Sequence, residues 1–138
     1  NIRKSSSAEL SHALEYGESV TYTVDVVYPS EYAATFYDPV PTYTSYVSGS
    51  LSAPAGITYD PFLDAISGNL TLSTGVPQTL TFSAQIEVTG TAESAPLIVN
   101  RACIHPQGGG LATCEWSNEV VDFTYVWPVY LPLVLRSV

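Results

Sequence analysis

The chain has 138 residues, which is enough for one domain with a buried core. Hydrophobic residues make up 46% of it and charged residues 12%, a composition that excludes a disordered tail. Four Lys and Arg stand against thirteen Asp and Glu, for a net charge of −9. Nucleic-acid binding needs a basic surface. We therefore expect a folded domain with no nucleic-acid partner.

The two ends of the chain differ in character. Asn1–Ser7 is polar and does not resemble a signal peptide. The longest apolar run, Val126–Leu135, is interrupted by Pro128 and Pro132 and is shorter than the roughly 20 residues that span a bilayer. We expect a β-sandwich domain over residues 1–126 and no transmembrane segment. Residues 127–138 are interpreted as an apolar tail, either an added edge strand or a site of self-association.

Alternating hydrophobic and polar residues predict strands through most of the chain. In Ser19–Val27, one face carries Val20, Tyr22 and Val24, and Gln78–Val88 repeats the pattern over a longer stretch. The Asp38-Pro39 pair is expected to form a turn. Further strands are predicted over Ala34–Tyr37, Tyr43–Ser48, Ile57–Tyr59, Ala65–Ile66, Asn69–Leu72, Leu97–His105 and Cys114–Val126. Seven or eight antiparallel strands suffice for a two-layer sandwich.

The two cysteines flank a glycine-rich turn. Cys103 and Cys114 fall on the two arms of a predicted hairpin, which favours a cross-strand disulfide and an oxidising, extracellular compartment. A disulfide closing so short a loop contributes about 3 kcal/mol in the chain-entropy model. A zinc site is not expected, because only His105 accompanies the cysteines and four ligands are not available.

No enzyme motif is present in the sequence. Ser11 and His12 are adjacent, which does not make a catalytic triad, and no G-x-S-x-G occurs. We predict no catalytic residue and no cofactor. Asp60 and Asp64, together with Asp38, are weak candidates for Ca²⁺ ligands, but solvated loop carboxylates are the favoured interpretation, so no metal is expected.

Several segments resemble one family in the order that the family has them. GESVTYTVDVV, TFYDPVPTYTSYVSGS, PQTLTFSAQIEV and IVNRACI are similar to successive motifs of the DUF11 conserved repeat domain of bacterial surface and exported proteins. Tyr28-Pro29 replaces the family's usual Asn after the first strand, and the cysteine hairpin is not a general family feature. The resemblance implies an immunoglobulin-like or fibronectin-like antiparallel β-sandwich without catalytic residues.

Two functions remain open from the sequence. The first is a non-catalytic structural or adhesion repeat of an exported bacterial surface protein, acting as stalk, spacer or interaction module, whose partners are neighbouring domains. The alternative is a carbohydrate- or protein-binding module attached to a secreted enzyme, with a glycan or protein as ligand. Tyrosines gathered near turns fit either function, because they cap sandwich ends or bind a partner.

Strand alternation places three polar residues on apolar faces. Lys4 has the same parity as Ile2, Asp38 the same as Phe36, and Asn100 the same as Ile98. One interpretation is a buried hydrogen-bond network around Asn100, with Lys4 reaching solvent. The other is a Lys4–Asn100 isopeptide bond, formed with a neutral Asp38 as proton donor, since burial lowers a lysine pKa and raises an aspartate pKa.

Overall fold

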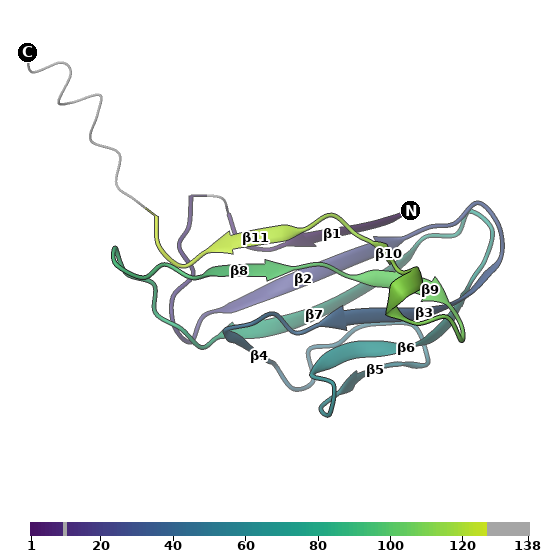
Figure 1. Ribbon diagram of the computed structural model, residues 1–138, viewed down its shortest axis with the longest axis horizontal. Coiled ribbons are helices and arrows are strands. Elements are labelled where there is room, and N and C mark those ends of the chain that lie inside the picture. The colour runs from purple at the N-terminus through teal and green to yellow at the C-terminus, as the bar shows by residue number, and fades with distance from the viewer. Residues whose placement is uncertain (10, 127–138) are drawn as a thin grey trace, which may run out of the picture.

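The computed structural model describes residues 1–9 and 11–126. These residues form eleven strands and one 3₁₀ turn, arranged as an antiparallel immunoglobulin-like β-sandwich (Figure 1). The strands are β1 Ile2–Ser6, β2 Ser19–Val26, β3 Tyr32–Pro39, β4 Thr44–Tyr46, β5 Ile57–Asp60, β6 Ala65–Leu72, β7 Gln78–Ile86, β8 Leu97–Asn100, β9 Cys103–Pro106, β10 Glu115–Trp116 and β11 Val120–Phe123. The predicted fold class is confirmed, with more and shorter strands than the seven or eight expected.

Hydrogen bonding divides the strands into three sheets. One has the order β1-β2-β7-β4, the second β10-β9-β3-β6-β5, and the third consists of β11 and β8 alone. No helix of the described residues is long and apolar enough to cross a membrane. The prediction of an added strand in 127–138 lies outside the described residues.

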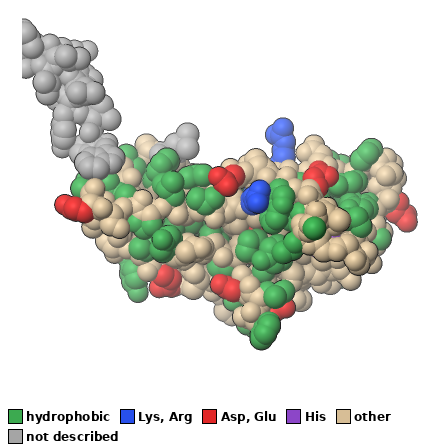
Figure 2. Space-filling model, viewed as in Figure 1, with side chains coloured by type: hydrophobic (Ala, Val, Ile, Leu, Met, Phe, Trp, Pro, Cys, Tyr) green, Lys and Arg blue, Asp and Glu red, His purple; other side chains and the backbone are tan. Residues whose placement is uncertain are grey.

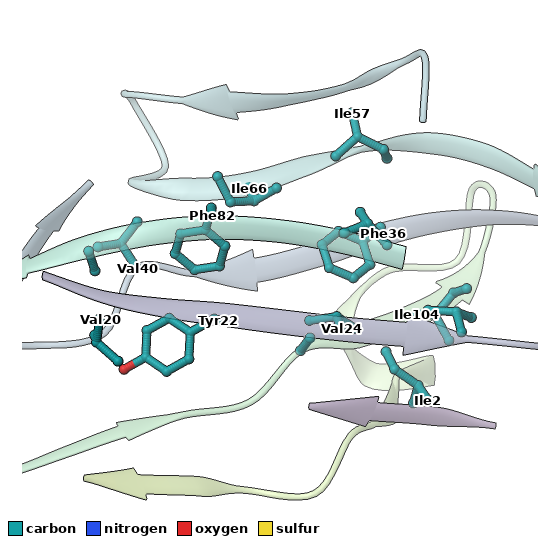
Figure 3. Close-up of a cluster of buried hydrophobic side chains, with 14 of the residues drawn as sticks. Ile2, Val20, Tyr22, Val24, Phe36, Val40, Ile57, Ile66, Phe82 and Ile104 are labelled. Atoms are coloured by element: carbon teal, nitrogen blue, oxygen red, sulfur yellow. The ribbon is translucent and has the colours of Figure 1, made fainter. Parts of the chain in front are cut away.

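The core follows from the alternation of β2 and β7. These strands are neighbours in one sheet, with Val24 opposite Leu80 and Tyr22 opposite Phe82, so their apolar side chains lie side by side on the same face of that sheet. This face turns inward, where a continuous cluster of buried side chains fills the space between the layers (Figure 3). Burial of apolar area, at roughly 25 cal/mol per Å², is the main force that holds such layers together.

The predicted strand Leu97–His105 is divided in the structure. β8 ends at Asn100 and pairs with β11, whereas β9 begins at Cys103 and pairs with β3 and β10. Between them Ala102 bonds to Ser117 instead of to a strand partner: Ser117 N donates to Ala102 O, and Ala102 N donates to Ser117 Oγ. The chain thus changes sheets at this point, as strands do at the corners of sandwiches.

The expected Asp38-Pro39 turn is wrong. β3 continues through Pro39, which lies opposite Ala65 on β6. Val40 N donates to Asp64 O, on the β6 side of β3. Because successive backbone N–H groups of a strand point to opposite sides, the nitrogen of Pro39, which carries no hydrogen, faces the β9 side. There β9 reaches only as far as Tyr37. The proline therefore removes no ladder hydrogen bond, and Asp38 is held in a regular strand.

Candidate functional site

The structure brings Lys4, Asp38 and Asn100 into the interior, each from a different sheet. Lys4 is on β1, Asp38 on β3 and Asn100 is the last residue of β8. Their exposed fractions are 5%, 0% and 3%. Each follows the alternation of its strand, since the preceding inward positions are Ile2, Phe36 and Ile98. The sandwich thus places an amine, a carboxyl group and an amide where water is excluded.

Lys4 and Asp38 form a fully buried ion pair. Lys4 Nζ donates to Asp38 Oδ2, and neither side chain has solvent exposure. Aromatic rings surround the amine, whose Nζ lies 4.7 Å from the ring centroid of Tyr22 and 5.2 Å from that of Phe82. Both rings are part of the apolar core in Figure 3. The lysine therefore does not reach solvent, which corrects that part of the network interpretation.

Burial moves the pKa of both ionisable groups toward their neutral forms. It lowers the pKa of Lys4, against the opposing effect of Asp38. Burial also raises the pKa of Asp38 to about 6, outweighing the opposing effects of Lys4 and the Asn100 amide. Removing both charges from water is costly, and attraction within the pair offsets that cost only in part. Burial therefore brings a neutral amine beside a neutral carboxylic acid closer in free energy to the ion pair than it is in water.

Asn100 has polar atoms without partners. Its amide lies near enough to Asp38 to lower the pKa of that carboxyl. Neither Asn100 Oδ1 nor Nδ2, however, meets hydrogen-bond geometry with any described residue, and Asp38 Oδ1 is likewise unpaired. A buried polar group without a partner costs about 1–3 kcal/mol. Within the described residues, the Asn100 carboxamide is therefore placed beside Asp38 and does not tie the neighbouring backbone together.

The cluster has the three groups that amide exchange requires. A neutral lysine amine is a nucleophile, a carboxamide carbon is an electrophile, and a carboxylic acid supplies and accepts protons. All three belong to the protein itself and are buried within its sandwich. The chemistry available here is directed at the protein's own side chains.

Asn118 is a polar residue at this site that no pattern in the sequence predicts. It lies between β10 and β11, and its side chain makes two hydrogen bonds to the main chain of Lys4. Lys4 N donates to Asn118 Oδ1 over 2.9 Å, and Asn118 Nδ2 donates to Lys4 O over 2.8 Å. No short motif signals such a contact, because the two residues are separated by 114 positions.

Asp60 and Asp64 serve the turn between β5 and β6. Asp60 Oδ1 accepts hydrogen bonds from the main-chain N–H groups of Phe62 and Leu63, and Asp64 Oδ1 accepts one from the Tyr59 hydroxyl. Within residues 1–9 and 11–126 no group of three or more His, Cys, Asp or Glu side chains is placed to hold a metal ion. Asp38, on β3, is fully buried and accepts a hydrogen bond from Lys4 instead of lining this turn.

The predicted disulfide is confirmed. Cys103 at the start of β9 is bonded to Cys114, with a Cα–Cα distance of 5.5 Å. It closes the turn that contains the 3₁₀ segment Leu111–Thr113. His105 is directed to main-chain groups, through Nδ1 contacts with Pro106 O and Gly110 N.

Four of the tyrosines near the turns form two pairs, whereas Tyr16 and Tyr43 are exposed. Tyr46 and Tyr59 are stacked with ring centroids 4.1 Å apart, and Tyr28 and Tyr32 are 4.4 Å apart. All four are partly buried against the core, as expected of rings that cap a sandwich. Exposed hydrophobic side chains are spread among polar ones on the face shown in Figure 2. A surface hollow of about 600 Å³ beside β1 has no aromatic residue in its lining.

Comparison with known proteins identifies the fold. No protein-family model matches the chain, and no curated protein sequence matches it. Among solved structures, it is similar to BcpA, the major pilin subunit of Bacillus cereus, with a TM-score of 0.61 at 12% identity over 89% of this chain. A structure of the same pilin with one aspartate replaced by alanine gives 0.60 at 9% identity over 88%. The chain spans 39% of the length of either pilin chain.

Proposed function

We propose that this domain is a non-enzymatic structural module of an exported bacterial surface protein, and that a Lys4–Asn100 crosslink lets it resist tension. The observation that carries the proposal is the fully buried Lys4–Asp38 pair beside an amide without hydrogen-bond partners. Such an arrangement is costly as it stands. An amide bond between Lys4 and Asn100 removes the cost by replacing two buried charges with neutral groups.

The reaction balances without any other reagent. Lys4 Nζ gives a proton to the Asp38 carboxylate, and the neutral amine attacks Cγ of Asn100. Asp38 then passes its proton to the Asn100 nitrogen and takes the second proton from Lys4 Nζ. The bond between Cγ and the original amide nitrogen breaks, and ammonia leaves. The products are a Lys4–Asn100 amide and a neutral Asp38, which the raised pKa of this carboxyl favours.

The position of the bond suits a module under tension. Two hydrogen bonds join β1 to β11 and the residues before it, one between Lys4 and Asn118 and one between Ser6 and Asp122. Because the residue number increases in the same direction on both sides, the two strands are parallel. The N-terminus and the end of β11 therefore point in opposite directions along the long axis (Figure 1). A Lys4–Asn100 bond passes force directly from β1 to β8, the hydrogen-bonded neighbour of β11.

Other features support an exported module. The disulfide is stable in an oxidising compartment outside the cytosol. The segments resembling DUF11 repeats and the pilin-like fold agree with a location on a bacterial surface. The similar pilin chains are longer than this one, so we propose neighbouring domains of the same surface protein as the partners.

Stretching single molecules tests this function. With a handle attached to each end of the chain, the wild-type domain is expected to unfold without releasing residues 5–99, because the crosslink bypasses them. Asn100→Ala is expected to release that segment, at roughly 3.5 Å per residue. Asn69→Ala, an exposed amide on β6, is the control and should behave as wild type. Release of residues 5–99 from the wild-type domain would contradict the proposal.

A further inference from the structure

The main chain of Lys4 faces the open edge of β1. Ser7 N donates to Thr21 O on β2, so by alternation the N–H and C=O groups of Lys4 are directed away from β2. On that side the Asn118 carboxamide offers one acceptor and one donor, which is what a neighbouring strand would offer. The side chain of Asn118 thus fixes the peptide groups from which the reacting lysine projects.

Ser117, the residue before Asn118, is bonded to the chain just after β8, the strand that ends at Asn100. Ser117 makes two hydrogen bonds with Ala102. Ser117 N donates to Ala102 O over 2.7 Å, and Ala102 N donates to Ser117 Oγ over 2.9 Å. Ser117 Oγ also donates to Asn118 O over 2.9 Å, which restrains the backbone at these two adjacent residues. Ala102 is two residues beyond Asn100. A short series of hydrogen bonds therefore connects the backbone of the nucleophile with the backbone of the electrophile.

We propose that Ser117 and Asn118 form a bracket that positions Lys4 against Asn100 for the crosslinking reaction. This inference rests on the proposed function. The bracket residues touch neither reacting atom, and they act by setting the relative position of β1 and β8. Without them, β1 is held to the third sheet mainly by the Ser6–Asp122 hydrogen bond. Reactions between fixed groups depend steeply on such placement, and a misplacement of about 1 Å costs about a hundredfold in rate.

The two residues of the bracket differ in exposure, which makes the inference testable. Asn118 is exposed, so its truncation leaves no cavity and removes only the hydrogen bonds to Lys4. Ser117 is 7% exposed and lies at the corner between β8 and β9. Asn118→Ala is therefore the principal variant. Asn69→Ala is its matched control, because it also removes an exposed carboxamide with a hydrogen-bond partner, the Thr35 hydroxyl, but on β6, which belongs to a different sheet from β1.

The experiment follows crosslinking in newly made protein. The whole chain is synthesised in a cell-free reaction, translation is stopped, and intact mass is recorded over time as ammonia is lost. We expect Asn118→Ala to react about ten- to a hundredfold more slowly than wild type, and Asn69→Ala to stay within about twofold. The pH dependence of the rate should be unchanged in Asn118→Ala, because Asp38 still exchanges the protons.

Each outcome decides a different question. A folded Asn118→Ala that crosslinks as fast as wild type overturns the bracket and leaves the crosslink intact. A wild-type chain that never loses ammonia overturns the proposed function. If Asn118→Ala fails to fold, Asn118→Asp is used instead, because it retains the acceptor for Lys4 N and loses the donor to Lys4 O. Wild-type speed in Asn118→Asp would then count against the bracket, and slowed reaction would support it.

Discussion

Two links involve the late strands of this domain, and they differ in reach. The Cys103–Cys114 disulfide joins residues 11 positions apart within one corner of the sandwich. The cluster of Lys4, Asp38 and Asn100 instead joins the first strand to strands of both other sheets, in the middle of the core. One link holds a loop, whereas the other holds the layers together.

A covalent bond stabilises most where it encloses a long segment of the chain. In the chain-entropy model, closing a longer loop removes more freedom from the unfolded chain. The disulfide limits only the turn that carries it. A Lys4–Asn100 bond encloses most of the chain, including β2 to β7, so its loss should cost more than loss of the disulfide.

Removing the proposed crosslink should have the largest effect. Asn100→Ala is expected to lower the free energy of unfolding by about 4.7 kcal/mol, the loop-closure contribution of a loop of this length. Chemical denaturation of the purified domain, followed by tryptophan fluorescence, measures the change. Asn69→Ala serves as the control with an amide removed from an exposed strand. Equal stability of Asn100→Ala and wild type would show that no bond is lost.

Removing the disulfide should have a smaller effect. The double variant Cys103→Ser, Cys114→Ser is expected to lower the free energy of unfolding by about 3 kcal/mol, because the enclosed loop is short. Wild-type protein in a reducing agent provides an independent comparison. The loss of one ammonia relative to the variant's own formula mass should be unaffected. A disulfide variant less stable than Asn100→Ala would contradict the expectation that the Lys4–Asn100 bond stabilises the domain more than the disulfide does.

Acid should slow crosslinking without altering the product. The pKa of Asp38 is raised to about 6, mainly by burial. As the pH falls through that value, Asp38 gains a proton while Lys4 keeps its own, and the carboxyl can no longer accept a proton from the amine. We expect the rate of ammonia loss to fall below pH about 6 and to be nearly constant just above it. A rate that rises with acidity would exclude Asp38 as the proton acceptor.

Alternation in the sequence was enough for the core and for part of the site. The faces of β2 and β7 follow directly from their apolar residues, and the same parity placed Lys4, Asp38 and Asn100 inward. The disulfide followed from two cysteines on the arms of one hairpin. These features depend on neighbours in sequence, which a single chain displays.

Contacts between distant segments could not be predicted in this way. The break between β8 and β9 depends on the hydrogen bonds between Ser117 and Ala102. The alternation of apolar and polar residues in Leu97–His105 does not predict this break. The strand through Pro39 depends on the absence of a β9 partner beyond Tyr37. Asn118 contacts Lys4 only because β1 and β11 meet in three dimensions. Such facts belong to the tertiary structure.

The intact mass of the purified, folded wild-type domain shows whether Lys4 and Asn100 are joined by an amide bond. The disulfide is first reduced, and the Asp38→Ala variant is measured beside the wild type. We predict that the wild-type chain is lighter than its formula mass by one ammonia, that a Lys4–Asn100 peptide is recovered after digestion, and that Asp38→Ala has its full formula mass. A folded wild-type chain at its full formula mass would contradict the account.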